Sequence, residues 1–432
     1  MRESWRSIRA LAGLWLVAQF TCSSALQAQD LRGHGGPVRA IAVSADGKIV
    51  VTGSFDESVI RWNAATGSAL SVLRGHEGSV NTVAMLGDGR LATAGQDGRI
   101  LLWGEDSAPL ASLEGHSAPV SSLAISPDGR TIASASWDQT VRVWPLDGNK
   151  PRILEGHVGN VNAVAFAPDE RVVSAGYDGT IRIWPESGAP QVLSFAIPFS
   201  ALAVAPDGQI LAASVDGTLR FFPKDGGEAA EMSTGGKPVV ALSITKDGAR
   251  IAAGTIDGRI ILIERLSRRV IAEVTGAGSP LWSLAFLPDG SQILSGSGDR
   301  AVRRWDGSTG APLSRDFALA RDDIPPQLKG ERGAEVFKAC AACHTVTPNG
   351  GPRAGPPLHG VFGRRIATAS GYNYSTALKS LDIVWTAETV SKLFEIVPSA
   401  YTPGTKMPEQ IVSAADREAL IEFLLKATKT SP

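Results

Sequence analysis

One phrase recurs ahead of position 310 in this chain of 432 residues. It consists of a strand-like stretch of alternating apolar residues, a Pro/Ala/Lys-Asp-Gly turn, a second stretch rich in small residues, an Asp turn, and a third stretch that usually ends in Trp. Self-similarity at a period of about 20–50 residues predicts a repeat architecture in which each unit packs against its neighbours. The turn aspartates recur every 38 to 42 residues, and they are Asp56, Asp97, Asp138, Asp178, Asp216, Asp257 and Asp299.

Each copy has room for four short strands with tight turns, because strands in globular proteins run about five to six residues. Copies of four-stranded sheets that stack around a common axis bury the faces that a single sheet leaves exposed. The repeat therefore predicts an all-β domain, a seven-bladed β-propeller, which we place at residues 29–317.

The first four copies share two further features: a Gly-His pair ahead of the turn Asp, and the closing Trp. The pattern resembles WD-repeat proteins. In that family the His, the turn Asp and the Trp hydrogen-bond within a blade, so the resemblance implies that these polar residues serve the fold. Later copies lack the Gly-His pair, and Phe222 and Ile263 replace Trp in the fifth and sixth, whereas the seventh keeps Trp305. The shared residues are Gly33-His34, Gly75-His76, Gly115-His116 and Gly156-His157, followed by Trp62, Trp103, Trp144 and Trp184.

Closure of the ring requires one blade to combine both chain ends, since an open ring leaves a strand edge unpaired. Either Asp30 to Gly33 or Ala311 to Phe317 could supply the last outer strand. The sequence does not choose between them.

Length and charge limit the number of domains and the classes of partner that this chain can have. A chain of 432 residues is too long for one compact core, so two or three domains are expected. The formal net charge is -1, and there are no basic runs, so the chain offers no electrostatic footprint for nucleic acid or an acidic membrane surface. We expect neither as a partner.

The first 28 residues have the pattern of a secretory signal peptide. Arg2, Arg6 and Arg9 precede an apolar run from Ala10 to Phe20, and small and polar residues follow. Spanning a bilayer takes about 20 apolar residues, and this run is shorter. We therefore predict cleavage after residue 28, export to the periplasm and no integral membrane anchor in the mature protein.

A different signature stands in the last quarter of the chain, where Cys340, Ala341, Ala342, Cys343 and His344 follow one another. A C-x-x-C-H sequence marks covalent haem attachment. On a helix, positions i, i+3 and i+4 share one face, so two thiols can reach the haem vinyl groups while the imidazole reaches the iron. The only other cysteine lies in the predicted signal peptide. One signature predicts one covalent haem c.

A short stiff linker at 318–329, which contains Pro325 and Pro326, separates the propeller from a domain at 330–432. This domain resembles the class I cytochromes c, which are all-α. The resemblance is carried by the haem signature and by two later loops in the right order, at 355–364 and 401–408. It implies a carrier of single electrons.

The resemblance also implies a set of site residues. Met407 matches the sixth iron ligand opposite His344, and the Pro356 carbonyl matches the group that accepts a hydrogen bond from the ligand imidazole. Burying haem propionates without partners would be costly. The positions that match their partners are Arg364, Tyr372, Tyr374, Trp385 and Thr405.

Basic side chains could ring the haem edge and steer an acidic redox protein or respiratory complex toward it. Such residues more often only solvate a surface, so both interpretations stay open. The candidates are Lys338, Lys392, Lys406 and Arg353.

Four of the six histidines belong to the Gly-His pairs, which leaves His344 and His359. His359 matches an exposed loop residue of the cytochromes, and we assign it no chemistry. A metal centre in the propeller would draw on several histidines or cysteines, so we expect no copper and no second haem there. Quinone-cofactor dehydrogenases are also propellers, but they resemble this chain poorly.

The tight turns that end at each repeat Asp expose the preceding residue on one rim of the propeller. Three of these residues are aromatic, namely Phe55, Trp137 and Tyr177, and Trp282 could join them. Exposed Trp and Tyr are favoured at interface hot spots, which suggests a docking face. The rings could equally lie flat on neighbouring turns.

Three functions compete at this point. The first is an exported electron carrier, not itself an enzyme, whose propeller docks a redox protein or respiratory complex and tethers the haem close to it. In the second, the propeller is an oxidoreductase domain that passes electrons to its own haem, and in the third it is a scaffold with a redox-sensing haem. The first accounts for every strong motif, and we adopt it as the prediction.

Overall fold

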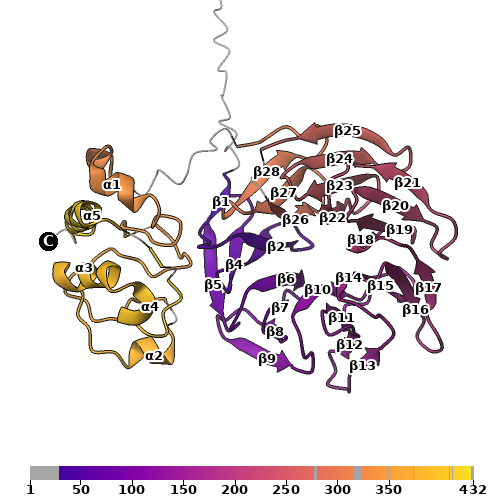
Figure 1. Ribbon diagram of the computed structural model, residues 1–432, viewed down its shortest axis with the longest axis horizontal. Helices are drawn as coiled ribbons and strands as arrows, with labels where there is room; N and C mark the ends of the chain where they lie inside the picture. The colour runs from indigo at the N-terminus through magenta and orange to yellow at the C-terminus, as the bar shows by residue number, and fades with distance from the viewer. Residues whose placement is uncertain are drawn as a thin grey trace, which may run out of the picture.

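The computed structural model describes residues 29–276, 280–314, 324–348, 350–372, 374–407, 409–410 and 412–429. In these residues the chain forms seven four-stranded antiparallel sheets set around a ring, and a smaller helical domain beside them (Figure 1). The predicted fold class, a seven-bladed propeller followed by a helical domain, is confirmed. The predicted signal peptide at 1–28 lies outside the described residues.

Blades one to four follow chain order, each with its four strands in sequence. Their strands are β2 (Val38–Val43), β3 (Ile49–Ser54), β4 (Ser58–Asn63), β5 (Ala69–Arg74), β6 (Val80–Met85), β7 (Leu91–Gly95), β8 (Ile100–Trp103), β9 (Pro109–Leu113), β10 (Val120–Ile125), β11 (Thr131–Ser136), β12 (Val141–Pro145), β13 (Arg152–Leu154), β14 (Val161–Phe166), β15 (Val172–Gly176), β16 (Thr180–Trp184) and β17 (Gln191–Ser194).

Blades five and six repeat this order, and blade seven combines three late strands with the first strand of the described chain. Their strands are β18 (Phe199–Val204), β19 (Ile210–Ser214), β20 (Thr218–Phe222), β21 (Ala230–Ser233), β22 (Val239–Ile244), β23 (Arg250–Thr255), β24 (Ile260–Glu264), β25 (Arg269–Val274), β26 (Leu281–Phe286), β27 (Gln292–Ser297), β28 (Ala301–Asp306) and β1 (Leu31–Arg32).

Both chain ends close the ring, which is why the sequence could not choose between them. Leu31 of β1 pairs with Val302 of β28, while Pro312 forms an antiparallel bridge to Trp305 at the other end of β28. The Ser314 hydroxyl donates a hydrogen bond of 2.6 Å to the Asp30 carboxylate and so joins the two ends. No strand edge of blade seven is left open along this seam.

The propeller core lies between neighbouring blades rather than within one blade. One buried cluster joins Val51, Val59 and Leu73 of blade one to Leu91 and Trp103 of blade two. Full burial of such a side chain stabilises the fold by about 1.5–3 kcal/mol. Because the second strand of each blade is covered on both faces, it is made mostly of small and aliphatic residues, as in the fully buried β7.

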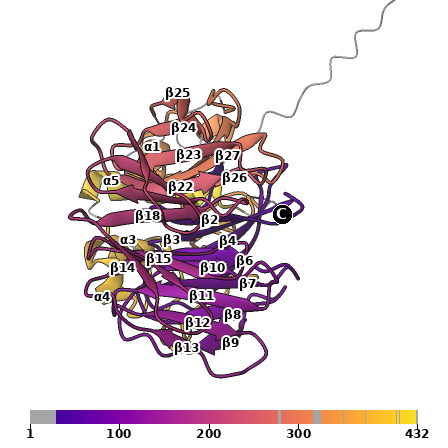
Figure 2. The ribbon, with the colours of Figure 1, turned by 90° about the vertical axis from the view of Figure 1, so that its right-hand side faces the viewer.

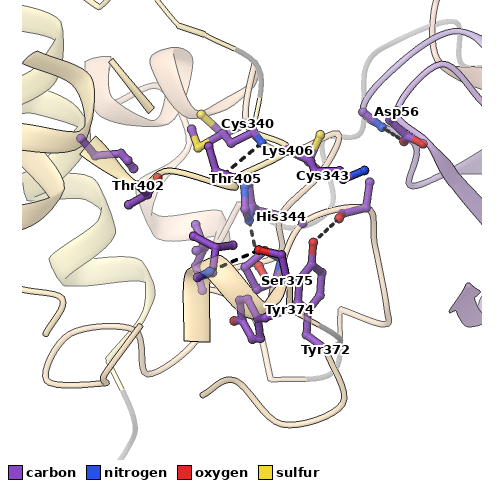
Figure 3. A pocket seen from close by; sticks show the side chains of 18 of the residues that line it. Asp56, Cys340, Cys343, His344, Tyr372, Tyr374, Ser375, Thr402, Thr405 and Lys406 are labelled. Atoms are coloured by element: carbon purple, nitrogen blue, oxygen red, sulfur yellow. Dashed lines mark hydrogen bonds between the residues drawn. The ribbon is translucent and has the colours of Figure 1, made fainter. Parts of the chain in front are cut away.

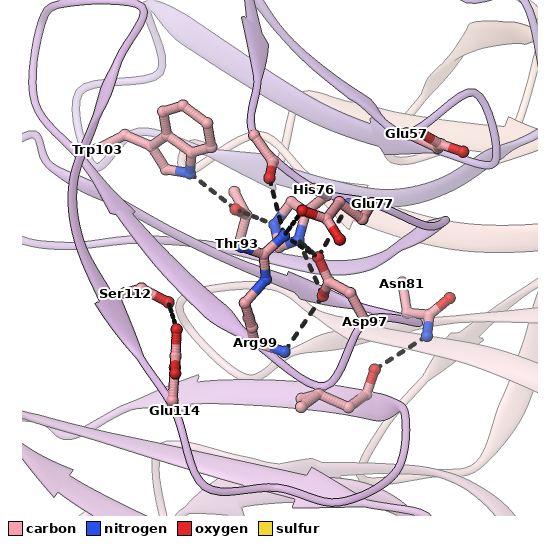
Figure 4. Close-up of polar contacts among 12 residues, drawn as sticks. Glu57, His76, Glu77, Asn81, Thr93, Asp97, Arg99, Trp103, Ser112 and Glu114 are labelled. Carbon is pink, nitrogen blue, oxygen red and sulfur yellow. Dashed lines mark hydrogen bonds and ion pairs between the residues drawn. The ribbon is translucent and has the colours of Figure 1, made fainter. Parts of the chain in front are cut away.

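The recurring polar residues form one hydrogen-bonded chain in each of the first four blades, shown for blade two in Figure 4. Trp103 donates its indole N–H to the Thr93 hydroxyl over 2.8 Å, and this hydroxyl donates to His76 Nε2, also over 2.8 Å. His76 Nδ1–H then points at the Asp97 carboxylate, 2.9 Å away. Burial makes unpaired polar groups costly, so the four residues act together as a structural unit.

The later blades replace this chain of contacts. In blade five Arg220 takes over, donating to the Ser214 hydroxyl at 2.7 Å and to the Glu231 carboxylate at 2.8 Å. In blade seven Trp305 still donates to Ser295, at 2.8 Å, but no His reaches that hydroxyl among the described residues. The sequence-based expectation that the later blades depart from the pattern is therefore confirmed.

The helical domain is built around a buried contact between its first and last α-helices. It contains a 3₁₀ turn, η1 (Pro326–Leu328), and the helices α1 (Arg332–Phe337), α2 (Thr376–Lys379), α3 (Ala387–Glu395), α4 (Pro398–Tyr401) and α5 (Ala414–Ala427). Phe337 of α1 and Phe423 of α5 stack with ring centroids 5.2 Å apart. Ile324 and Leu328, which belong to the predicted linker, are buried in the same core.

The helical domain lies against one side of the propeller, next to β1, β4 and β5 (Figure 1), and behind it in the view of Figure 2. Within the described part of the chain, no helix has both the length and the apolar character needed to cross a bilayer.

Candidate haem site

A cavity of about 840 Å³ opens in the helical domain and extends to the propeller. Its size is within the range of about 300–1,000 Å³ typical of cofactor and ligand pockets. The residues that the sequence singled out for haem attachment, iron ligation and propionate contacts all line this one cavity. They are Cys340, Cys343, His344, Pro356, Arg364, Tyr372, Tyr374, Trp385, Thr405 and Met407.

The haem signature forms a single helical turn after α1, not a continuation of that helix. The Cys340 carbonyl accepts hydrogen bonds from Cys343 N at 3.0 Å and from His344 N at 2.9 Å. The carbonyls that would continue a helix are bonded elsewhere: that of Cys343 by Gly355 N at 2.7 Å, and that of His344 by Arg353 at 3.2 Å. The expected helix is therefore shorter than predicted, but the two thiols and the imidazole still share the cavity (Figure 3).

His344 is held in one tautomer. Its Nδ1 lies 2.8 Å from the Pro356 carbonyl oxygen, and because a carbonyl can only accept, Nδ1 must carry the proton. Nε2 is then the nitrogen with a lone pair available for iron. Burial lowers the pKa of His344, which favours the neutral imidazole that a metal needs.

A glycine fixes where this ring lies. A Cβ atom built on Gly355 would come 2.7 Å from Nδ1 of His344, closer than non-bonded atoms approach each other. Only glycine lets the 354–356 loop press against the imidazole in this way. The loop thus supplies both the hydrogen-bond acceptor for His344 and a wall behind its ring.

The two cysteines carry free thiols in the described fold. Burial raises the pKa of Cys340 to about 12 and that of Cys343 to about 11. Such groups are protonated near neutral pH and therefore do not act as thiolates. This suits a permanent thioether bond better than a redox-active dithiol or a thiolate metal site.

Met407 lies in a loop that several hydrogen bonds hold beside the cavity. Its backbone N–H donates to the Thr405 hydroxyl over 3.1 Å, and Thr405 N donates to the Thr402 carbonyl over 3.0 Å. From the other side, the Ser375 hydroxyl donates to the Gly404 carbonyl over 3.0 Å. Ser375, which sequence reasoning missed, is an ordinary helix cap of α2 and carries no signal of this second role.

The predicted propionate partners line the cavity, and the N–H and O–H groups of Arg364 and Tyr372 bond backbone carbonyls of the surrounding loops. Arg364 donates to the carbonyls of Pro357 at 2.7 Å and His359 at 3.2 Å, and Tyr372 donates to the Ala354 carbonyl at 2.8 Å. Burial raises the pKa of Tyr372 to about 12, so its hydroxyl remains a donor. Trp385 is tied to Arg364 through a backbone hydrogen bond of 3.0 Å. Donors of this kind fit a group that brings buried carboxylates.

These observations together fit a haem c: two thiols, one oriented imidazole, one thioether, and donors for two carboxylates line a cavity of suitable size. The apolar remainder of the wall comes from helix residues such as Val390 and Phe394 of α3. Their helical spacing predicts a core but not which core residues face a cofactor.

Part of the cavity wall comes from the propeller, which the sequence did not reveal. The contributing residues belong to blades one, two and seven, and no motif connects positions so far apart in the chain. They are Gly35, Gly36, Phe55, Asp56, Glu57, Arg74, Gly75, His76, Glu77 and Arg300.

The four basic residues proposed to ring the haem edge have different partners. Lys338 and Lys392 pair with Glu335 and Glu388 on their own helical segments. Arg353 bonds backbone carbonyls of the haem-signature turn. Lys406 forms an ion pair with Glu57 of the propeller.

Three of the rim aromatics predicted for docking are exposed, with 40% of Phe55, 42% of Trp137 and 61% of Tyr177 accessible. Trp282 is more covered: its ring lies 5.9 Å from that of Phe55 and 4.5 Å below the Arg39 guanidinium. It packs on neighbours rather than standing out from the rim.

Comparison with known proteins gives two separate matches along the chain. The family model described as WD domain, G-beta repeat matches residues 26–63, 67–104, 107–145, 148–185, 195–222 and 268–306. The family model described as cytochrome c matches residues 330–428.

Three cytochromes c each match about a quarter of the chain. A cytochrome c of Gibberella zeae is 43% identical over 101 residues, covering 23% of this chain and 94% of the relative. A cytochrome c of Kluyveromyces lactis is 42% identical over 108 residues, or 24% and 97% of the two chains. One of Arabidopsis thaliana is 41% identical over 109 residues, or 25% and 96%.

This similarity supports a haem-binding electron-carrier domain with a covalently bound haem. The repeats, in turn, agree with the observed blades and their hydrogen-bonded chains. The chain belongs to the WD-repeat β-propellers in its first part and to the cytochrome c family in its second.

Proposed function

We propose that this protein is an exported carrier of single electrons, with one haem c attached to Cys340 and Cys343 and its iron held by His344 and Met407. The observation that carries the proposal is that these four residues line one cavity and that Pro356 leaves Nε2 of His344 as the nitrogen free to ligate.

The bound haem would supply reversible one-electron chemistry at its iron, and a thioether opposite an imidazole favours the reduced state. The protein's own residues have simpler tasks. Pro356 and Gly355 orient the imidazole, the 402–407 loop positions the thioether, and Arg364, Tyr372 and Tyr374 offer donors to the propionates. With His344 and Met407 both bound to it, the haem iron would have no site left for a small molecule.

The propeller, in this proposal, docks a redox protein or respiratory complex. The exposed rings of Trp137 and Tyr177 support this role, because aromatic residues of this kind often anchor interfaces. A tethered haem would then meet its partner at a high effective concentration. The signal-peptide pattern at 1–28 supports the periplasm as the compartment of this encounter.

The ligand set is tested on the haem-loaded mature protein with the variant Met407→Leu, which keeps the volume but removes the sulfur. We expect covalent haem to be retained, the charge-transfer absorption of sulfur on ferric iron to disappear, and the midpoint potential to fall. An unchanged spectrum and potential would show that another group is the sixth ligand.

The number of haems and the export are tested on the same preparation. The mass of the intact protein should exceed that of the chain from residue 29 by one haem. A second haem, or a retained segment before residue 29, would contradict the corresponding part of the proposal.

A further inference from the structure

Loops and strand ends of blades one and two make most of the propeller surface that faces the cavity, and Arg300 of blade seven adds to it. We call the part made by blades one and two the blade 1–2 rim and define it by Gly33, Gly35, Glu57, Arg74 and His76. Lys406 of the cytochrome domain forms an ion pair with this rim. The question is what this contact does.

Backbone and side-chain contacts hold the two domains together at this rim. Ala354 N donates to the Gly33 carbonyl over 2.9 Å, and Arg74 donates to the Ala354 carbonyl. The Arg74 guanidinium also lies 4.8 Å from the centre of the Tyr372 ring, a favourable cation–π distance. The rim therefore engages the loop that carries the acceptor for His344.

A second group of contacts surrounds Lys406, the neighbour of Met407. Its ammonium pairs with the Glu57 carboxylate and donates to the His76 carbonyl over 3.3 Å. The rim thus contacts two loops of the cytochrome domain. Through Ala354 it contacts the loop with Pro356, the acceptor for His344, and through Lys406 it contacts the loop with Met407.

Gly35 makes this approach possible. A Cβ atom on Gly35 would lie 2.6 Å from Sγ of Cys343, so the propeller backbone rests directly against a haem-attachment residue. The other three Gly-His pairs are followed by larger residues, namely Glu77, Ser117 and Val158. Blade one therefore leaves space for the cytochrome domain, because Gly35 lacks the side chain that the other three blades have at this position.

Glu57 occupies the position after the turn Asp, where it has a positive φ of 65°. Gln139 and Arg300 have positive φ at the same position of blades three and seven, and the other four blades have glycine there. This backbone conformation therefore belongs to the turn of every blade. What distinguishes Glu57 is that the turn aims its carboxylate at Lys406, with which it forms an ion pair.

We propose that the blade 1–2 rim is a docking surface for the chain's own cytochrome domain and covers the Cys343 edge of the haem site. An external redox protein with an acidic face would compete with Glu57 for Lys406 and reach that edge when the domains separate. One electron then passes between that protein and the haem iron. This inference rests on the proposed electron-carrier function and deepens it.

The docked state is tested first without any electron transfer. A zero-length carbodiimide reagent joins a lysine and a carboxylate that are in contact, with loss of one water. In the mature haem-loaded protein, peptide mapping should find a Lys406–Glu57 link. The Lys426–Glu331 pair, 3.1 Å apart within the cytochrome domain, serves as the positive control. Finding that control link without Lys406–Glu57 would overturn the proposal.

Variants then test whether docking limits the access of a small reductant to the haem. Gly35→Ser installs the residue that blade three has at this position, so the blade should fold while the cytochrome domain is displaced. Glu57→Lys reverses one charge of the ion pair. Both should lose the Lys406–Glu57 contact and speed the reduction of the haem by ascorbate. A surface ion pair shifts such an equilibrium by up to about fivefold, so we expect Glu57→Lys to raise the rate about two- to fivefold at low salt.

The matched control is Glu114→Lys, which makes the same change in charge on the same propeller. Glu114 is exposed and does not line the cavity, and its carboxylate accepts a hydrogen bond from the Ser112 hydroxyl over 3.2 Å. The rate of this variant should stay near that of the natural protein, and the double variant Glu57→Lys, Lys406→Glu should restore the slow rate. Equal acceleration by Glu57→Lys and Glu114→Lys would show that the effect is general electrostatics and would refute docking.

The outcomes separate this inference from the proposed function. If the protein carries haem and takes up one electron reversibly but shows neither the link nor the change in rate, docking fails and the carrier function stands. If the mature chain binds no haem at all, the carrier function itself fails, whereas the crosslink still reports on the domain contact.

Discussion

His344 donates its Nδ1 proton to the carbonyl of Pro356 over 2.8 Å, and the neighbouring Gly355 leaves no room for the ring to move back. The imidazole is therefore oriented before any metal arrives. Because the loop at 354–356 is also the part of the cytochrome domain that meets Gly33 and Arg74 of the propeller, the orientation of the iron ligand and the contact between the domains share one segment.

Gly355→Ala tests this orientation. The added methyl group should force the ring or the loop to shift, and overpacking of this kind costs about 1–3 kcal/mol. We expect a lower midpoint of thermal unfolding for the haem-loaded domain and a changed iron–imidazole signature in resonance Raman spectra. Gly87→Ala is the control, since a Cβ there meets no atom within 4 Å. Identical behaviour of the two variants would contradict the role given to Gly355.

A matched pair of serines tests the hydrogen-bonded chain of the blades. Ser174 bonds both His157, at 2.8 Å, and Trp184, at 2.8 Å, whereas Ser295 bonds Trp305 alone of these two residue types. Both serines are fully buried. Each unpaired buried group costs about 1–3 kcal/mol, so Ser174→Ala should lower the free energy of unfolding more than Ser295→Ala does. Denaturant titration of both variants measures this difference. A larger loss for Ser295→Ala than for Ser174→Ala would contradict the role given to the hydrogen-bonded chain of the blades.

The stability of the propeller should fall as the pH drops below about 6.5, the usual pKa of histidine. Burial lowers the pKa of His116 and of His157, although their aspartate partners oppose this. Both are therefore neutral in the folded state, while the unfolded chain takes up protons there. A lowered folded-state pKa stabilises the fold above the unfolded pKa, and this stabilisation is lost at lower pH.

The measurement is the free energy of unfolding at pH 7.5 and at pH 5.5 in the same buffer system. His157→Gln should be less stable than the natural protein at pH 7.5, but its stability should depend less on pH over this interval. An equal or steeper dependence would mean that His157 is not the group that takes up the proton.

The exposed rim aromatics give a prediction about partners. Trp137→Ala and Tyr177→Ala should weaken retention of the proposed redox partner on the immobilised haem-loaded protein, while the haem spectrum stays unchanged. Truncating an interface hot spot typically costs at least about 2 kcal/mol, or some thirtyfold in affinity. Leu110→Ala, on the outer strand β9 and 60% exposed, is the control. If the double variant without both aromatic rings still retains the redox partner as well as the natural protein does, these residues are not part of a docking surface.

Local periodicity made much of the architecture predictable. The spacing of the turn aspartates located seven blades, because each blade is one self-contained unit of the repeat. The last helix, α5, buries Leu420, Phe423 and Leu424, whose spacing of three and four residues is that of one helix face. The closing strand was not predictable, since both Leu31 and Pro312 pair with β28 and a choice between two alternatives had no single answer.

The site residues within the cytochrome domain were predictable because a covalent haem demands fixed residue types at fixed spacing. The contribution of the propeller was not. Gly35 lies in an ordinary blade loop and Arg74 at the end of strand β5, and their nearness to Cys343 and Tyr372 depends on how two domains pack. The extent of the haem-signature helix was also missed, because its end is set by hydrogen bonds from Arg353 and Gly355.

The seam of blade seven has a consequence for how the protein is made. The strand at Leu31 stands at the beginning of the described chain, yet Val302 of its partner β28 lies 271 residues later, by subtraction of the two positions. The ring can therefore close only after all seven blades have been made. The hydrogen bond from the Ser314 hydroxyl to Asp30 then joins the two ends of the propeller. Closure of the propeller and placement of the cytochrome domain beside blade one therefore both follow the synthesis of the last blade.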